Sequence, residues 1–500
     1  MRLLPTRDPL PWRGASVRGG PSRAIPVDAQ ATGREEWDRP ATGGALILRS
    51  GRFIRCALAA ASLFLAAACG STSSGSGSSP EQLAADGFVF GYPLVVTERT
   101  MQAFAPVVGI NRPFTQKARS DASSRIVVAP NTDTLYAIAV LDLRSGPLLL
   151  TLPEIRGRYH TFQMLDAWTE SFAYLGTRTT GGAAGTWLLV PPGWSGAAPA
   201  GATRIDVPTR QAFLLGRVLV QDDADVANVV ALTSRVTIAP LDPGAPATPP
   251  LGTNPGPPAE TGSNGLAFWD ELGDALAIDP PTTDLQRALL AELAALGVGP
   301  GRHPSTEVTD PAIRAALEAG IALGSARIDE AADATSTIDG WRFRTDIGTY
   351  GDDLDTRAVI ARTGWGANVP AEAVYPFTGV DADGVTLDGT NLYRIHFDAD
   401  ALPPVDAFWS LTLYGPDRFL VDNSLHRFAL GDRSPGLAYG ADGSLDLWVG
   451  NAAPAGREAN WLPAPAGEFS LMLRLYLPTE NVLAARWTPP SIERVEGVTP

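Results

Sequence analysis

The sequence TLYAIAVLDLRSGPLLLTL, residues 134–152, decides the fold of the N-terminal half. Two apolar runs, 134–143 and 147–152, flank the turn residues Arg144, Ser145 and Gly146. Apolar runs of this length, with turn residues between them, are typical of strands. The pattern predicts an all-β sandwich or jelly roll over residues 81–240. Outward from this stretch, further runs of the same kind lie at residues 126–129, 159–165, 186–190 and 213–220.

The C-terminal half contains a second set of strand patterns, in which apolar and polar residues alternate. A period of two is typical of a strand with one face in a core. It predicts a second sandwich or jelly-roll-like domain over residues 346–500. The runs lie at residues 392–397, 408–414, 419–421, 445–449 and 469–477.

Helical patterns accompany the two β-rich halves. Residues 241–263 are rich in Pro, Gly and Thr and predict a loop, whereas residues 264–345 have apolar residues at helical spacing. A helical entry is expected at residues 81–104, with Pro93 breaking or kinking it. The fold class is therefore mainly β with a helical insert: two β-sandwich or jelly-roll-like domains joined by a helical block.

Residues 49–68 have the pattern that is typical of an export signal. Residues 49–68 begin with Arg49, Arg52 and Arg55, continue with a short apolar stretch, and end in small residues before Cys69. This is the order of a secretory signal, and the Cys directly after the small residues resembles a bacterial lipoprotein signal. We expect lipidation of Cys69 and an exported, membrane-anchored lipoprotein that faces the periplasm or the cell exterior. A simple secreted protein is the alternative.

Two segments flank this signal. Residues 1–48 are rich in Arg, Pro and Gly without apolar periodicity, and we interpret them as a start codon assigned too early or a disordered extension. Residues 69–80 form a Ser/Gly-rich stretch that we expect to be a flexible linker.

Composition restricts the partners. Without residues 1–68 the chain carries 29 basic and 49 acidic residues, a net charge of −20. Such an acidic surface disfavours nucleic acid and anionic lipid, so we expect membrane contact through the lipid anchor only. Cys56 and Cys69 are the two cysteines, and both lie before the folded body, which excludes disulfides there. The four His lack metal-ligand spacing, and neither a metal nor a cofactor is expected.

Long motifs in both halves carry a resemblance to a known family. They are APNTDTLY at residues 129–136, GRY at 157–159, LPPVDAFWSLTLY at 402–414, NWLPAP at 460–465 and RLYLP at 474–478. Together they resemble bacterial proteins that pair the domain of unknown function 1254 with the domain of unknown function 1214, over roughly residues 85–240 and 340–495. The resemblance implies two β-sandwich domains joined through helices. It supplies no catalytic residue, because no activity is established for the family.

The N-terminal motifs offer candidate ligand contacts. Asn131 and Asp133 favour a tight turn before a strand, because their side chains bond their own backbone. The functional interpretation instead places Asn131, Asp133 and Tyr136 at the mouth of a pocket. On the next motif strand, Tyr159 and Gln163 share one face, which suits either solvent or a sugar-like ligand.

The C-terminal motifs offer a second group. Arg474 and Tyr476 share the polar face of one strand, and Arg394 lies on the polar face of another. If these faces align in one sheet, they form a platform of donors with aromatic walls; an ordinary outward face is the alternative. Trp461 lies in a Pro-rich loop that is suited to line a pocket.

Three functions remain open at this point. The first is binding of a small polar molecule, sugar-like or phosphate-like, through these residues. The second is a hydrolase or lyase with Asp133 or Asp166 as general base and Tyr136, Tyr159 or Arg474 stabilising developing charge. The third is a structural or assembly protein of the cell envelope.

Overall fold

The computed structural model describes residues 78–125, 129–251, 265–335 and 337–495. The predictions for residues 1–48, for the signal at 49–68, for Cys69 and for most of the linker lie outside these residues, as does most of the strand expected at 126–129. Within the described ranges, no helix combines the length and the apolar character needed to cross a membrane.

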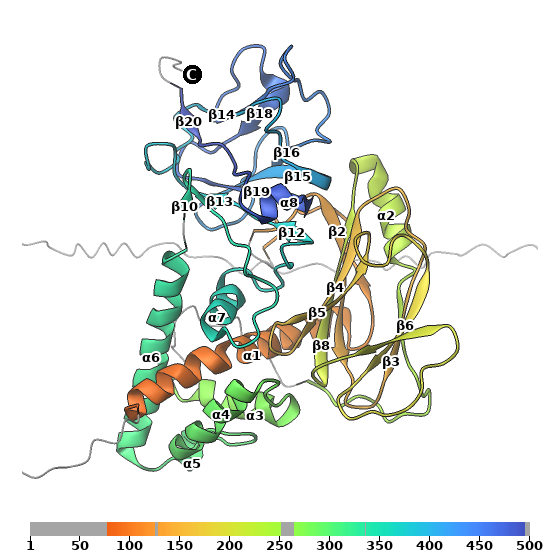
Figure 1. The fold of residues 1–500 in the computed structure, drawn as a ribbon, viewed down its shortest axis with the longest axis vertical. Helices are drawn as coiled ribbons and strands as arrows, with labels where there is room; N and C mark the ends of the chain where they lie inside the picture. The colour runs from red at the N-terminus through yellow and green to blue at the C-terminus, as the bar shows by residue number, and fades with distance from the viewer. Residues whose placement is uncertain (1–77, 126–128, 252–264, 336, 496–500) are drawn as a thin grey trace, which may run out of the picture. The chain divides into compact units, whose positions relative to one another are not determined.

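The N-terminal β region is a sandwich of two sheets (Figure 1). Its core fills the space between them with apolar side chains such as Leu135, Leu150 and Leu189. The first sheet has the order β1 (Phe114–Thr115), β2 (Thr134–Asp142), β8 (Gln211–Leu219), β4 (His160–Asp166), β5 (Ser171–Gly176). The second has the order β7 (Ala202–Asp206), β6 (Gly185–Val190), β3 (Leu148–Leu152), β9 (Thr237–Pro240).

The C-terminal β region is a second sandwich, so the predicted fold class is confirmed. Its core includes Ile395, Leu447 and Leu473 from both sheets. The larger sheet has the order β10 (Thr337–Ile338), β11 (Trp341–Arg342), β13 (Phe377–Thr378), β19 (Ser470–Pro478), β15 (Val405–Tyr414), β16 (Ala429–Gly431), with β12 (Ala373–Val374) also paired to β19. The smaller has the order β18 (Trp461–Pro463), β17 (Leu445–Gly450), β14 (Tyr393–Phe397), β20 (Glu493–Arg494). The strand expected at 419–421 is reduced to one bridge, between Tyr414 and Leu420.

The first helix, α1 (Pro80–Val108), continues through Pro93, so a break there is wrong, and a kink at Pro93 stays a prediction. Pro93 is buried, and the apolar packing of α1 compensates for the hydrogen bond that proline cannot make. Phe88 packs against Phe268, and Phe90 packs against Trp168, with tilted rings in both pairs. The helices that α1 contacts are α3 (Ala267–Ile278), α4 (Asp284–Leu293), α6 (Pro311–Asp333) and α7 (Leu354–Thr363) (Figure 1). The other α-helices of the described residues are α2 (Val226–Thr233), α5 (Pro304–Glu307) and α8 (Glu480–Leu483).

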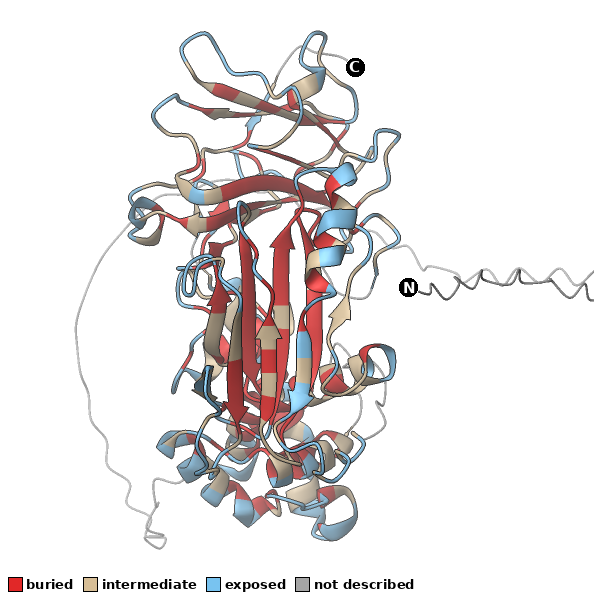
Figure 2. Cartoon of the chain, turned by 90° about the vertical axis from the view of Figure 1, so that its right-hand side faces the viewer, coloured by how far each residue is buried: buried red, intermediate tan, exposed pale blue. Residues whose placement is uncertain are grey.

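The sheet that contains β2, β8 and β4 is buried on both of its faces (Figure 2). Phe162 and Met164 of β4 enter the sandwich core, whereas Leu165 packs on the opposite face with Met101 of α1. All seven residues of β4 are buried, so the solvent interpretation of the Gln163 face is wrong. Polar groups on this second face must therefore find partners within the protein.

Candidate ligand site at the junction of the sandwiches

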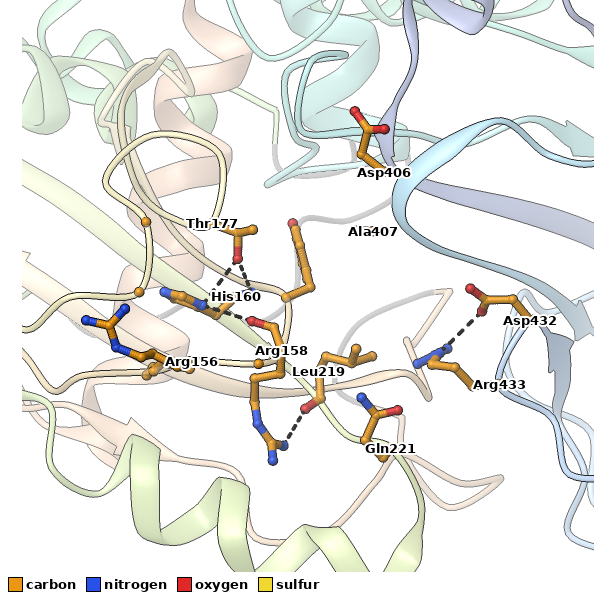
Figure 3. Close-up of a pocket in the computed structure, with 15 residues that line it drawn as sticks. Arg156, Arg158, His160, Thr177, Leu219, Gln221, Asp406, Ala407, Asp432 and Arg433 are labelled. Carbon is orange, nitrogen blue, oxygen red and sulfur yellow. Dashed lines mark hydrogen bonds and ion pairs between the residues drawn. The ribbon is translucent and has the colours of Figure 1, made fainter.

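A cleft of about 590 Å³ lies between the two β regions (Figure 3). Its N-terminal wall comes from the loop that precedes β4, from the loop that follows β5, and from the end of β8. The opposite wall comes from the start of β15 and the loop after β16. The residues that line it are Ile155, Arg156, Gly157, Arg158, Tyr159, His160, Thr177, Gly181, Gly182, Leu219, Gln221, Asp406, Ala407, Asp432 and Arg433.

The three arginines that line the cleft are already paired with carboxylates, Arg156 with Glu154 at 2.6 Å. Arg158 donates two hydrogen bonds to Asp225, at 2.6 and 3.0 Å, and this contact lowers the pKa of the Asp225 carboxyl. Arg433 donates to Asp133 at 2.8 Å and lies 3.4 Å from Asp432. Burial raises the pKa of the Asp432 carboxyl. The lining therefore offers donors and acceptors with little net charge.

His160 contributes a neutral imidazole to the N-terminal wall of the cleft. Its Nδ1 lies 3.3 Å from the Arg158 carbonyl oxygen and 3.3 Å from Thr177 Oγ1. Burial lowers the pKa of the ring below its ordinary value. At neutral pH the imidazole is therefore uncharged, with one nitrogen as donor and the other as acceptor.

Asp133 connects the two sandwiches beneath the cleft. One carboxylate oxygen accepts from the Ser410 hydroxyl at 2.6 Å, and the other accepts from Arg433 at 2.8 Å. The Asp133 amide donates to Asn131 Oδ1 at 2.6 Å, which confirms the expected turn. Asn131 Nδ2 in turn donates to the Tyr476 hydroxyl at 2.7 Å. Because both oxygens of Asp133 are occupied by charged or hydroxyl donors, this carboxylate is not a free general base.

Tyr159 makes a second connection across the junction. Its hydroxyl donates to Glu372 at 2.8 Å, and Arg178 donates to the other oxygen of the same carboxylate at 2.7 Å. The Tyr159 ring packs on Phe408 and Tyr476, which stack on each other at 4.2 Å. Burial raises the pKa of the Tyr159 phenol well above its ordinary value, so the group remains a donor at neutral pH.

Two further arginines lie in the interior behind these contacts. Arg474 donates to Thr412 Oγ1 at 2.8 Å, to the Ala129 carbonyl at 3.0 Å and to the Tyr414 hydroxyl at 2.5 Å. Arg217 donates to Gln163 Oε1 at 2.8 Å, to Asn368 Oδ1 at 3.2 Å and to the Gly366 carbonyl at 2.9 Å.

Comparison with known proteins shows which protein family each of the two β regions resembles. Residues 110–240 match the family model described as protein of unknown function (DUF1254), and residues 372–480 match protein of unknown function (DUF1214). The chain pairs a DUF1254 region with a DUF1214 region. The cleft thus lies between these two regions. No curated protein matches the chain.

Two solved structures are similar to the chain. The VPA0106 protein from Vibrio parahaemolyticus is 24% identical, with a TM-score of 0.65 over 84% of this chain and 100% of its own. This similarity supports the fold. A putative uncharacterized protein from Burkholderia cenocepacia is 17% identical, with a TM-score of 0.43 over 82% of this chain and 88% of its own.

The structure brings most of the predicted residues together at the DUF1254–DUF1214 junction, where they are linked to one another, and Tyr159 is the one among them that lines the cleft. Arg474 and Tyr476 lie on β19 and contact the DUF1254 region through hydrogen bonds with the Ala129 carbonyl and with Asn131. The residues that meet there are Asn131, Asp133, Tyr136, Tyr159, Gln163, Arg474 and Tyr476.

Asp166 lies at the other end of β4 from this junction. His160 pairs with Val218 and Asp166 with Ala212, so six residues of strand, about 20 Å, separate the two ends. The Asp166 carboxylate accepts from the Trp168 and Glu170 amides at 2.8 and 2.9 Å. Asp133 and Asp166 therefore do not form a carboxylate pair.

Arg394 and Trp461 do not line the cleft either. Arg394 lies on β14, in the smaller sheet of the DUF1214 region, where it forms an exposed ion pair with Glu493 at 2.7 Å. The hypothesis that its face aligns with that of Arg474 in one sheet is wrong, because β14 pairs only with β17 and β20 within the described residues. Trp461 donates to the Gly450 carbonyl at 2.8 Å and so fixes the β17–β18 edge.

Sequence reasoning missed several functional candidates. Arg217 had a usable signal, since it is the one charged residue inside the apolar run 213–220. Glu372 and Arg433 had none, because they lie outside periodic segments. Their importance arises from contacts with Tyr159 and Asp133, more than 200 residues away in sequence.

Proposed function

We propose that the chain binds a small, neutral, hydroxyl-rich molecule, such as a sugar, in the cleft between the DUF1254 and DUF1214 regions. The observation that carries this proposal is a lining contributed by both regions, in which every arginine is already paired with a carboxylate. Its volume, about 590 Å³, falls in the range of small-molecule sites.

The pairing of charges favours a neutral ligand over an anion. Paired Arg and Asp side chains present donors and acceptors side by side, which matches hydroxyl groups that do both. Asp406 and Asp432 would repel a phosphate placed between them and Arg433. The cleft therefore supports a sugar-like ligand better than a phosphate-like one.

Binding is expected to depend on lining residues that have no role in the fold. Thermal unfolding of the protein is measured against a panel of neutral sugars, polyols and phosphorylated sugars. Ligand at 100 times its dissociation constant stabilises the protein by about 2.7 kcal/mol, which raises the Tm visibly. We expect Asp406→Asn and Gln221→Ala, both at exposed positions, to weaken binding several-fold, at about 1 kcal/mol per lost hydrogen bond.

Arg394→Gln is the matched control, because this arginine is exposed and lies on the sheet that contributes nothing to the cleft. It should leave the shift unchanged. No shift from any neutral sugar or polyol, or a shift that survives both lining substitutions, would contradict the proposal.

We also propose that the protein works at the cell envelope, tethered through a lipid on Cys69. The support is the order of charged, apolar and small residues before this Cys. In a bacterial host, Cys69→Ser is expected to abolish labelling of the chain by a fatty-acid probe and to shift it from the membrane to the soluble fraction. Unchanged labelling in Cys69→Ser, or a wild-type chain without label, would count against the anchor.

A further inference from the structure

We infer that a second site, for a small organic carboxylate, lies in the interior between Arg217 and Arg474, behind the cleft. This inference is independent of the neutral ligand proposed above. It arises from buried positive charge that the protein itself leaves uncompensated.

The two guanidiniums differ from the other buried arginines in their partners. Arg99 and Arg357 each form an ion pair, with Glu271 at 2.5 Å and Glu170 at 2.9 Å. Arg217 and Arg474 are 7% and 3% exposed, yet neither forms an ion pair among the residues that the structure describes. Their hydrogen bonds go to amide, carbonyl and hydroxyl oxygens only.

Such an arrangement is costly without an anion. A buried charge is strongly unfavourable unless it is paired, because neutral acceptors replace its hydration only in part. Asp133 acts on Arg474 through space, but its oxygens already accept from Ser410 and Arg433. A bound carboxylate would supply the missing charge and accept charge-assisted hydrogen bonds from the guanidiniums.

Both guanidiniums face one group of tyrosines. The Tyr375 phenol lies within electrostatic range of Arg217 and Arg474 alike, and both oppose the rise in its pKa that burial causes. Arg217 lies 5.8 Å above the Tyr136 ring, and Arg474 lies 5.6 Å from the Tyr414 ring. The two cations thus belong to one cluster.

Two of these tyrosines are only partly buried. Tyr136 and Tyr375 keep part of their surface accessible, whereas Tyr414 and Tyr476 are fully buried. Within the described part of the chain, the Tyr136 hydroxyl has no hydrogen-bond partner. Aromatic rings favour a flat apolar body beside them, so an aromatic carboxylate suits this cluster better than a compact, strongly hydrated phosphate.

Wild-type protein supplies the first test. Tm is measured with benzoate, with benzamide, which has the same shape and no charge, and with inorganic phosphate. Benzoate is expected to raise the Tm, while benzamide at equal concentration leaves it unchanged. Equal shifts from benzoate and benzamide, no shift from benzoate, or a shift from phosphate instead would overturn the inference.

Variants then locate the binding. Benzoate affinity is measured by calorimetry. Arg217→Gln is expected to weaken binding at least tenfold, and Tyr136→Phe is expected to weaken it about threefold. Tyr136→Phe removes only an unpaired hydroxyl, so it keeps the test valid if Arg217→Gln does not fold. Arg156→Gln, in the cleft, and the exposed Arg394→Gln should leave benzoate affinity unchanged. Loss of binding in Arg156→Gln would place benzoate in the cleft, and retention in Tyr136→Phe would equally refute the buried site.

Discussion

Replacing Asp133 by alanine is expected to lower the free energy of unfolding by about 3–5 kcal/mol. The carboxylate holds Ser410 and Arg433 of the DUF1214 region from a turn of the DUF1254 region, and it is 5% exposed. Its loss removes the nearer of the two carboxylates that contact Arg433 and the acceptor of the Ser410 hydroxyl, and breaking a largely buried ion pair is strongly destabilising. Urea denaturation of wild type and variant measures the difference.

Two further variants show whether the loss of the Asp133 charge causes the loss of stability. Asp133→Asn keeps an oxygen for one donor and should cost less than Asp133→Ala. Asp206→Ala removes an exposed carboxylate, paired with Arg204 at 2.7 Å, and should cost at most about 1 kcal/mol. If Asp133→Ala is no more harmful than Asp206→Ala, the connection between the regions contributes little to stability.

The second large effect is a dependence of stability on pH that comes from Asp166. Burial raises the pKa of this carboxyl to about 7, although Arg357 and two backbone amides oppose the rise. An unfolded Asp has a pKa of about 3.9. The folded protein therefore binds the proton more tightly, so this stabilisation is complete below about pH 4 and is lost as the pH rises to about 7.

Asp166→Asn removes this titration while keeping a carbonyl oxygen for the Trp168 and Glu170 amides. The stability of wild type relative to Asp166→Asn is expected to fall by roughly 2–4 kcal/mol between pH 4 and pH 7. Denaturant midpoints at several pH values measure it. Asp279 also has a pKa raised by burial, to about 7, but it is present in both proteins and cancels in the comparison. Parallel pH curves for the two proteins would show that Asp166 does not titrate in this range.

The sequence predicted the strands well because burial patterns are local. Alternation along β4 placed Phe162 and Met164 on one face and Gln163 on the other, and the structure has the same division. It did not predict that both faces are buried. The run of residues 135–141 is apolar at nearly every position, which is typical of a strand covered on two sides.

The sequence predicted only part of the candidate site, because the rest depends on how strands pair in the folded chain. Alternation shows which face of a strand a residue occupies, but not which sheet the strand joins. Arg474 and Arg394 had the same pattern, and tertiary pairing placed them in different sheets. Glu372 lies in a loop, so only the folded chain brings it to Tyr159.

The central claim is that the DUF1254 and DUF1214 regions share one ligand site. Hydrogen–deuterium exchange tests it most directly, with the panel compound that raises the Tm most. The account predicts slower exchange in two segments at once, residues 155–160 of the DUF1254 region and residues 431–434 of the DUF1214 region. Protection confined to one of these segments, or located elsewhere, would contradict it.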